Sequence, residues 1–273
     1  MPTLLRDTVI VLMLAAGLGT YGSAQTNSSN PAVAGSQATN PQMPATGGRF
    51  DQQIQQEVTS ELQNHDWAKD IHATTEDGIV TLRGSVPLYI YKERAYEKIH
   101  NKLHVQGVRN LIAVKGPEVP DTQLRLQLAD KLRYDRIDRG IMFNNFELGV
   151  NNGVVTISGQ ARTPTDASSA LSIIENTSGV KEVVDNINVL PASPRDDELR
   201  MQVARAIYSA GPLQKYALSP EAPIRIVVDR GHVTLYGVVD TPMDKQIADM
   251  QARSVPGVFS VTDKLAVSSQ QQK

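Results

Sequence analysis

A strand bounded by two glycines occurs three times in this 273-residue chain, and its recurrence limits the folds that the chain can adopt. The copies are residues 77–84, 152–159 and 230–237, and in each copy the two glycines are six residues apart. Asp-Gly or Asn-Gly before alternating apolar residues is a strong β-hairpin signal, because a type I′ turn needs positive φ at both central residues. We therefore expect each copy to form the second strand of a hairpin.

The glycines of these strands are predicted to shape the fold and to do no chemistry. They are Gly78, Gly84, Gly153, Gly159, Gly231 and Gly237. Alternation along the strand places the closing glycine of each copy on the apolar face. A glycine at that point leaves room for a helix to pack, so a valine in place of Gly159 is expected to overpack the contact between helix and sheet.

The first 24 residues resemble a secretory signal peptide, with Arg6 near the start, an apolar run at 9–18 and small residues before Gln25. The apolar stretch is shorter than the ~20 residues of a spanning helix, which favours cleavage over a retained anchor. No cysteine is present, so disulfides and a lipid-modified cysteine are excluded. The mature product is expected to be soluble.

Two segments are predicted to be disordered. Residues 25–49 form a polar linker rich in Asn, Ser, Pro and Gln with almost nothing to bury, and residues 269–273 form a short polar tail. Structure is therefore expected to begin near residue 50.

Each hairpin belongs to a longer repeated pattern. The expected elements are first helices at 52–64, 122–134 and 198–209; first strands at 71–75, 146–150 and 224–228; second helices at 92–104, 166–176 and 243–254; and third strands beginning at Gly107, Gly179 and Gly257. Apolar residues three and four apart mark the buried face of each helix, for example Met243, Ile247 and Met250. The predicted fold class is α+β, with three tandem α-β-β-α-β units, each having two helices on one face of a small mixed sheet.

The repeats are expected at 50–116, 121–190 and 197–268, joined by short proline-containing links. The third strand of the first repeat is predicted to be shortened. Gly107 lies seven residues before Val114, whereas the corresponding stretches from Gly179 and Gly257 are ten residues long.

The repeated order, the pattern Gly-x-Val-Thr-Leu/Ile-x-Gly and the later Gly-Val together resemble the BON domain, a family named for bacterial OsmY and nodulation proteins. Three copies would cover nearly all of the chain after the linker. The resemblance implies a periplasmic or envelope protein without enzymatic activity. Proteins of this kind are associated with osmotic or envelope stress, with phospholipid surfaces and, in some cases, with chaperone-like action on outer-membrane proteins.

The residues themselves give no sign of an enzyme. The chain has no cysteine nucleophile, no Gly-x-Ser-x-Gly elbow and no phosphate-binding loop, so no cofactor and no small-molecule substrate are expected. Lys and Arg total 27 against 29 Asp and Glu, and the three repeats carry net charges of −1, −2 and 0. No repeat has the basic footprint of a nucleic-acid-binding domain.

His100 and His104 have the spacing of a helical metal pair, and Glu93 and Glu97 continue the same line. These residues lie opposite the expected apolar stripe, on a solvated helix face without a pocket. We therefore expect no metal site, and a small-ion or metal sensor stays as an alternative function.

One segment combines basic and apolar residues in the way that interfacial attachment requires. The predicted lipid-binding residues are Lys131, Arg133, Arg136, Arg139, Ile141, Met142 and Phe143. The alternative is that Ile141 and Phe143 continue the first strand or cover the core. This alternative is favoured because large apolar side chains are usually buried.

The leading hypothesis is an exported, non-enzymatic protein that binds phospholipid surfaces or envelope proteins and protects against osmotic or envelope stress. We expect it in the periplasm, either soluble or peripherally associated with a membrane. The main alternative is a periplasmic chaperone for outer-membrane proteins, which would need no lipid contact.

Overall fold

The computed structural model of the chain describes residues 48–135, 140–219 and 223–268. The predicted signal peptide, nearly all of the predicted linker and the predicted tail lie outside the described residues. No helix in the described part of the chain is both long and apolar enough to cross a bilayer.

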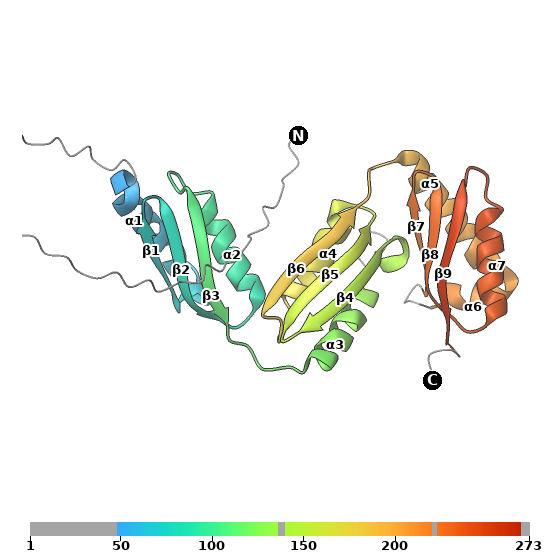
Figure 1. Cartoon of the computed structure of the whole chain (residues 1–273), viewed down its shortest axis with the longest axis horizontal. Helices are drawn as coiled ribbons and strands as arrows, with labels where there is room; N and C mark the ends of the chain where they lie inside the picture. Colours follow the sequence, from blue (N-terminus) through green and yellow to red (C-terminus); the bar gives the residue numbers. More distant parts are fainter. Residues whose placement is uncertain (1–47, 136–139, 220–222, 269–273) are drawn as a thin grey trace, which may run out of the picture. The chain divides into compact units, whose positions relative to one another are not determined.

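Three units of the same element order follow one another along the described residues (Figure 1). Repeat 1 contains η1 (Gly48–Phe50), α1 (Asp51–Gln63), η2 (Asp66–Ala68), β1 (Ile71–Glu76), β2 (Ile79–Val86), α2 (Tyr89–His100) and β3 (Gly107–Val114). Repeat 2 contains α3 (Asp121–Arg133), η3 (Gly140–Phe143), β4 (Asn145–Asn151), β5 (Val154–Ala161), α4 (Pro164–Glu175) and β6 (Glu182–Val189). Repeat 3 contains α5 (Pro194–Ser209), η4 (Gly211–Leu213), α6 (Gln214–Ala217), β7 (Ile224–Asp229), β8 (His232–Val239), α7 (Pro242–Arg253) and β9 (Ser260–Val267).

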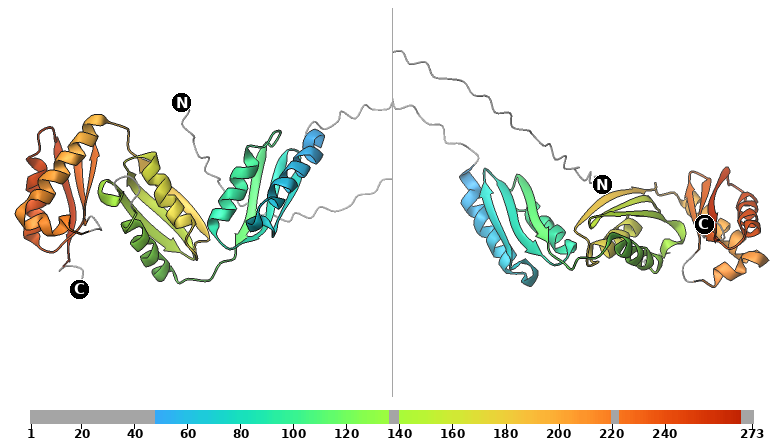
Figure 2. Two further views of the ribbon diagram at one scale, coloured as in Figure 1. Left: turned by 180° about the vertical axis from the view of Figure 1, so that it is seen from behind. Right: turned by 60° about the horizontal axis from the view of Figure 1, so that its bottom comes forward.

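Each repeat has one three-stranded mixed sheet. The second strand is central, with the first strand antiparallel on one side and the third strand parallel on the other. The two long helices of a repeat cover the same face of its sheet, as Figure 1 and the view from behind in Figure 2 show. The predicted α+β class and the α-β-β-α-β order are therefore confirmed.

The core of each repeat lies between the sheet and its two helices. In repeat 2, Val155 and Ile157 of β5 are fully buried with Leu124 and Leu128 of α3 and Ile174 of α4. Side chains alternate on β5, and the apolar residues of α3 recur every four positions, so both elements present one apolar face.

The hairpin turns have the backbone geometry that the sequence predicts. Both central residues have positive φ in every repeat: 50° and 74° at Asp77 and Gly78, and 52° and 78° at Asn152 and Gly153. In repeat 3 the first of the two positions is held by Arg230, with φ 50°.

An aspartate in the first turn of each first helix holds the hairpin turn of the same repeat. The carboxylate of Asp51 accepts hydrogen bonds from the backbone N–H groups of Asp77 and Gly78, both at 2.9 Å. Asp121 binds the turn of repeat 2 at 2.7 and 3.0 Å, and Asp196 binds that of repeat 3 at 3.0 and 2.9 Å. We call this contact the aspartate clamp.

The closing glycines are required for a different reason from the one expected. Gly159 has φ 112°, and a Cβ there would fall on the backbone carbonyl oxygen of Asn145, inside van der Waals contact. Gly84 and Gly237 meet the carbonyl oxygens of Asp70 and Pro223 in the same way. The constraint is thus the close approach of the first strand's backbone, and not the packing of a helix.

The prediction of a shortened third strand in repeat 1 is wrong, because β3, β6 and β9 all have eight residues. Gly179 and Gly257 lie in the turn three residues before their strands, with φ 94° and 91°. The residue three positions before β3 is His104, which has φ 66°. A histidine therefore takes the left-handed position that glycines take in repeats 2 and 3.

The second helices also differ from expectation. In α7 the buried face carries Asp244, Ala248 and Ala252, while Met243 and Met250 are 61% and 58% exposed. Small alanines let the helix approach the sheet closely. The prediction followed the large apolar residues instead, and it therefore chose a different face of the helix. The expected stripe of Met243, Ile247 and Met250 was therefore wrong for its two methionines.

Candidate functional site

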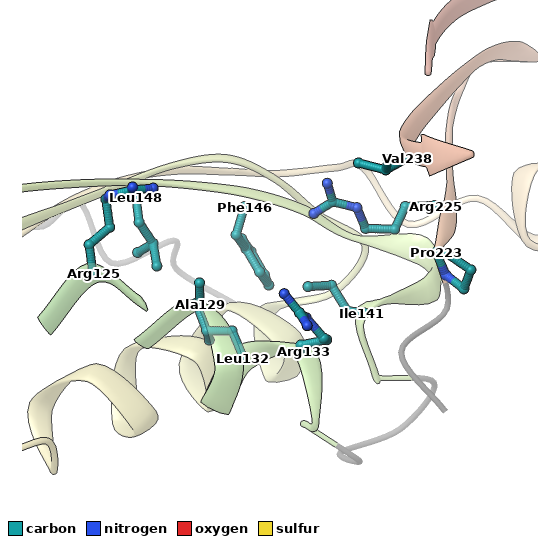
Figure 3. Close-up of a pocket in the computed structure, with 11 residues that line it drawn as sticks. Arg125, Ala129, Leu132, Arg133, Ile141, Phe146, Leu148, Pro223, Arg225 and Val238 are labelled. Carbon is teal, nitrogen blue, oxygen red and sulfur yellow. The ribbon is translucent and has the colours of Figure 1, made fainter. Parts of the chain in front are cut away.

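A cavity of about 400 Å³ lies where repeats 2 and 3 meet (Figure 3). Its lining comes from α3, η3 and β4 of repeat 2 and from β7 and β8 of repeat 3, together with the residue before β7. The lining residues are Arg125, Ala129, Leu132, Arg133, Ile141, Phe146, Leu148, Pro223, Arg225, Gly237 and Val238. Three of them are arginines and none is acidic, so the cavity combines cationic groups with apolar walls.

The helix α3 presents Arg125, Ala129 and Arg133 to the cavity because residues four apart share a helix face. Alanine in the middle keeps the space between the two arginines open. On the other side, Arg225 extends from the edge strand β7 toward Phe146 (Figure 3).

Burial lowers the pKa of the Arg225 guanidinium; the nearby Glu147 acts to raise this pKa, and the like charge of Arg133 acts to lower it. The group keeps its charge at neutral pH, because the pKa of arginine starts far above 7. Arg133 and Arg225, from different repeats, thus place two positive charges near one another. The carboxylate of Glu147 offsets part of this charge.

Part of the predicted lipid-binding segment reaches this cavity. Arg133 and Ile141 line it, whereas the ammonium of Lys131 donates a hydrogen bond to Thr177 Oγ1 at 3.0 Å. Arg136 and Arg139 lie outside the described residues. The basic half of the predicted patch is thus only partly placed by the structure.

The apolar half of the segment is not a free surface. Phe143 is 2% exposed and belongs to the core of repeat 3, in one cluster with Ile224 and Ile226 of β7. Met142 packs against the same cluster. The burial of Phe143 agrees with the alternative that it covers a core, although the core is that of the next repeat. Lipid binding by the segment stays a prediction.

Two of the three cavity arginines were missed in the sequence. Arg125 lies eight residues before Arg133, so a helical projection of α3 would have placed both on one face. Arg225 had no signal of its own, because its position depends on how repeat 3 meets repeat 2. Gln160 and Tyr236 also join these repeats, with a hydrogen bond of 3.3 Å from the tyrosine hydroxyl.

The possible metal face does not form. Helix α2 ends at His100, and His104 lies beyond it and stacks on Phe50 with the ring centroids 3.8 Å apart. His100 stacks on Tyr96. The described residues contain no group of three or more His, Cys, Asp or Glu side chains placed to hold a metal ion.

The buried carboxylates have structural partners. Asp196 forms an aspartate clamp, and Asp166 completes a capping box with Thr163 at the start of α4. Burial acts to raise the pKa of Asp244, but hydrogen bonds from Lys215, Tyr216 and Thr241 outweigh it, and the pKa lies below its ordinary value. None of these carboxylates lines the cavity.

Three consecutive stretches match the model of the BON domain, at residues 50–116, 120–191 and 195–269. They cover well over half of the chain, so the chain belongs to the BON domain family. Three BON domains in tandem are what the repeated glycine pattern predicted.

Among curated proteins, the chain is similar to Osmotically-inducible protein Y of Escherichia coli (strain K12). The two are 26% identical over 196 residues, which is 67% of this chain and 95% of that protein. Among solved structures, it is similar to the C-terminal domain of CdsD, a structural protein of the type III secretion system of Chlamydia trachomatis. That match has 13% identity, covers 78% of this chain and 96% of the other, and has a TM-score of 0.23, from which nothing further is inferred.

Proposed function

We propose that this chain is an exported, non-enzymatic BON protein of a bacterial envelope that binds anionic phospholipid during osmotic stress. The observation that carries the proposal is the cavity between repeats 2 and 3, with Arg125, Arg133 and Arg225 among apolar side chains. Membership of the BON family and similarity to a protein named for osmotic induction support the stress role. The signal-like start supports export to the periplasm.

The chemistry of the cavity suits an anionic headgroup that carries an acyl chain. Guanidinium groups bind phosphate oxygens through pairs of parallel hydrogen bonds. Ile141, Phe146 and Leu148 supply apolar contacts for the first carbons of the acyl chain. A cavity of about 400 Å³ is within the range of small-molecule sites, and it would accept a headgroup but not a whole lipid.

The test is binding of a soluble short-chain phosphatidylglycerol to the mature chain, residues 25–273, by calorimetry. We expect binding that weakens at high salt and falls roughly tenfold or more in Arg125→Gln/Arg225→Gln, since each charged hydrogen-bonding partner contributes about 1.5–3 kcal/mol. Short-chain phosphatidylcholine and inorganic phosphate separate the contributions of net charge and of the acyl chain. Equal affinity of the double variant would remove the cavity as the site.

An envelope chaperone is a second candidate, favoured by the exposed methionines of α7. Met243 and Met250 are seven residues apart on one helix face, and flexible methionines suit varied apolar partners. The mature chain should then suppress aggregation of an unfolded outer-membrane protein, and Met243→Gln/Met250→Gln should abolish that effect. Suppression that is unchanged in the double variant would exclude this face.

A further inference from the structure

The hairpin end of repeat 3 carries an exposed aromatic ring among basic side chains. Phe259, just before β9, is 67% exposed. The Arg195 guanidinium carbon lies 5.7 Å from the centre of its ring, and the His232 ring lies 6.0 Å from it. Arg230, also exposed, occupies the adjacent turn. We call these four residues the repeat 3 tip.

The fold does not require an aromatic residue at this position. The backbone N–H of Phe259 donates to the carbonyl oxygen of Gly231 at 2.9 Å. Lys181 and Gln106 make the same hydrogen bond, at the same length, in repeats 2 and 1. A lysine and a glutamine therefore serve the backbone equally well. The side chain at this position lies against the turn glycine in every repeat, so that contact does not call for an aromatic ring.

The turn residue of the tip is also unfavourable for its backbone. Arg230 has φ 50°, in the left-handed region that Asn and Asp adopt more readily than arginine. Repeats 1 and 2 have Asp77 and Asn152 at this position. Repeat 3 thus keeps a cation where the turn alone would favour a small polar residue, and such local strain is typical of functional positions.

The charges of the tip are arranged toward solvent. Arg195, Arg230 and His232 are exposed, whereas Asp196 is buried and both of its carboxylate oxygens are bound by the turn. Asp229, partly buried at the end of β7, is the neighbouring acidic side chain on the ladder. The positive excess is modest, so an anionic partner would have to use the aromatic ring as well.

We infer that the repeat 3 tip is a contact site for an anionic bilayer surface, with Phe259 entering the headgroup region and Arg195 and Arg230 binding lipid phosphates. The exposed ring and the basic side chains lie together at one end of the hairpin, where one flat bilayer surface can meet all of them. Burial at the membrane interface stabilises an aromatic ring, and the negative surface potential of the bilayer attracts the basic residues beside it. The end of repeat 1 also has a ring, Phe50, but its turn carries the acidic Asp77.

This site is separate from the arginine-lined cavity, and the two can be tested independently. The assay is co-sedimentation of the mature chain with vesicles of phosphatidylcholine, with and without one quarter phosphatidylglycerol. The tip variants borrow residues from the other repeats: Arg230→Asn, as in repeat 2, together with Arg195→Gln, and separately Phe259→Gln, as in repeat 1. Lys181→Gln, at the position of Phe259 in repeat 2, is the matched control.

We expect each tip variant to lower partitioning onto anionic vesicles roughly tenfold or more, and the control to bind as the parent does. In a Trp67→Phe background, Phe259→Trp should show a blue-shifted emission that brominated lipid quenches. Retained folding is checked by circular dichroism.

Parent-like binding by both folded tip variants would overturn the assignment. Loss of binding in the arginine variant but not in Phe259→Gln, without quenching of the tryptophan, would also overturn it, because the ring would then not enter the headgroup region. If the cavity variant Arg125→Gln/Arg225→Gln loses the short-chain lipid while vesicle binding persists and depends on the tip, both sites stand. Failure of the parent to bind any vesicle would exclude the tip as a membrane contact, whereas short-chain lipid binding would still report on the cavity.

Discussion

At the scale of single residues, the positions with positive φ fall into two groups: those that require glycine and those that other residues can occupy. The closing glycines are demanded, because a side chain at Gly159 would strike the carbonyl oxygen of Asn145. The position before the third strand is a preference, since His104 takes it in repeat 1 and stacks on Phe50. Positive φ alone is thus tolerated, while positive φ combined with a backbone obstruction is not.

The first prediction separates these two causes. Gly159→Ala should destabilise repeat 2 by about 1–3 kcal/mol or more, because even one methyl group meets backbone and adopts a strained φ. Urea unfolding of the mature chain, followed by hydrogen exchange in β5, measures the loss.

Gly149→Ala is the matched control in the neighbouring strand. A Cβ there meets nothing nearer than Thr156 Cβ, at 3.9 Å, so stability should be retained or slightly increased. Equal stability of the two variants would show that the close approach to Asn145 does not constrain the residue.

At the scale of elements, the aspartate clamp joins the start of the first helix to a turn far along the chain. In repeat 2 the two N–H groups of the turn converge on one carboxylate, that of Asp121. A carboxylate near a helix N-terminus is also favoured by the helix dipole. The clamp therefore holds the first helix against the hairpin through hydrogen bonds that are additional to the packing of the core.

The second prediction is that Asp121→Ala lowers the free energy of unfolding by about 1.5–3 kcal/mol, since two charge-assisted hydrogen bonds are lost. Asp130→Ala, an exposed carboxylate on the same helix, should change it by about 0.5 kcal/mol or less. Thermal or urea unfolding of the mature chain compares them. A similar small change in both would mean that the turn keeps its geometry without the clamp.

The elements themselves could be predicted because their signals are local. Hairpin turns follow from Asp-Gly and Asn-Gly, and the stripe of Leu124, Leu128 and Leu132 fixed the buried face of α3. The face of α7 was missed because alanine carries a weak hydropathy signal and yet packs best where a helix lies close to a sheet. The cavity could be predicted only in part. Arg133 and Ile141 lie in one segment that combines basic and apolar residues, whereas Arg225 joins them through a contact between repeats.

At the scale of the whole molecule, neighbouring repeats share side chains. Tyr89 of α2 is buried in the core of repeat 2, and Lys92 forms an ion pair of 2.8 Å with Glu182 of β6. Phe143 of η3 is likewise part of the core of repeat 3. Each of these rings comes from one repeat and packs in the core of the next, so the cores of neighbouring repeats are in contact.

The third prediction follows from this sharing. Phe143→Ala should destabilise repeat 3 although the residue belongs to repeat 2, by about 3–5 kcal/mol, the usual cost of removing a buried phenylalanine. Hydrogen exchange of the β7 peptide in the mature chain is the direct measurement. Leu126→Ala, which removes an exposed side chain of repeat 2, should leave that exchange unchanged. Faster exchange confined to β4 and β5 would contradict the assignment of Phe143 to the core of repeat 3.

The aspartate clamp has a consequence for how such chains can be altered. The clamped residues are separated by 26, 31 and 34 positions in repeats 1, 2 and 3, yet the contact has the same geometry each time. The segment between the first helix and the first strand therefore varies in length without moving the hairpin. A foreign peptide or a labelling tag inserted in this segment of repeat 1, at the exposed Lys69 and away from the buried Ala68, should leave the hairpin in place, because lengthening a closed loop costs little free energy.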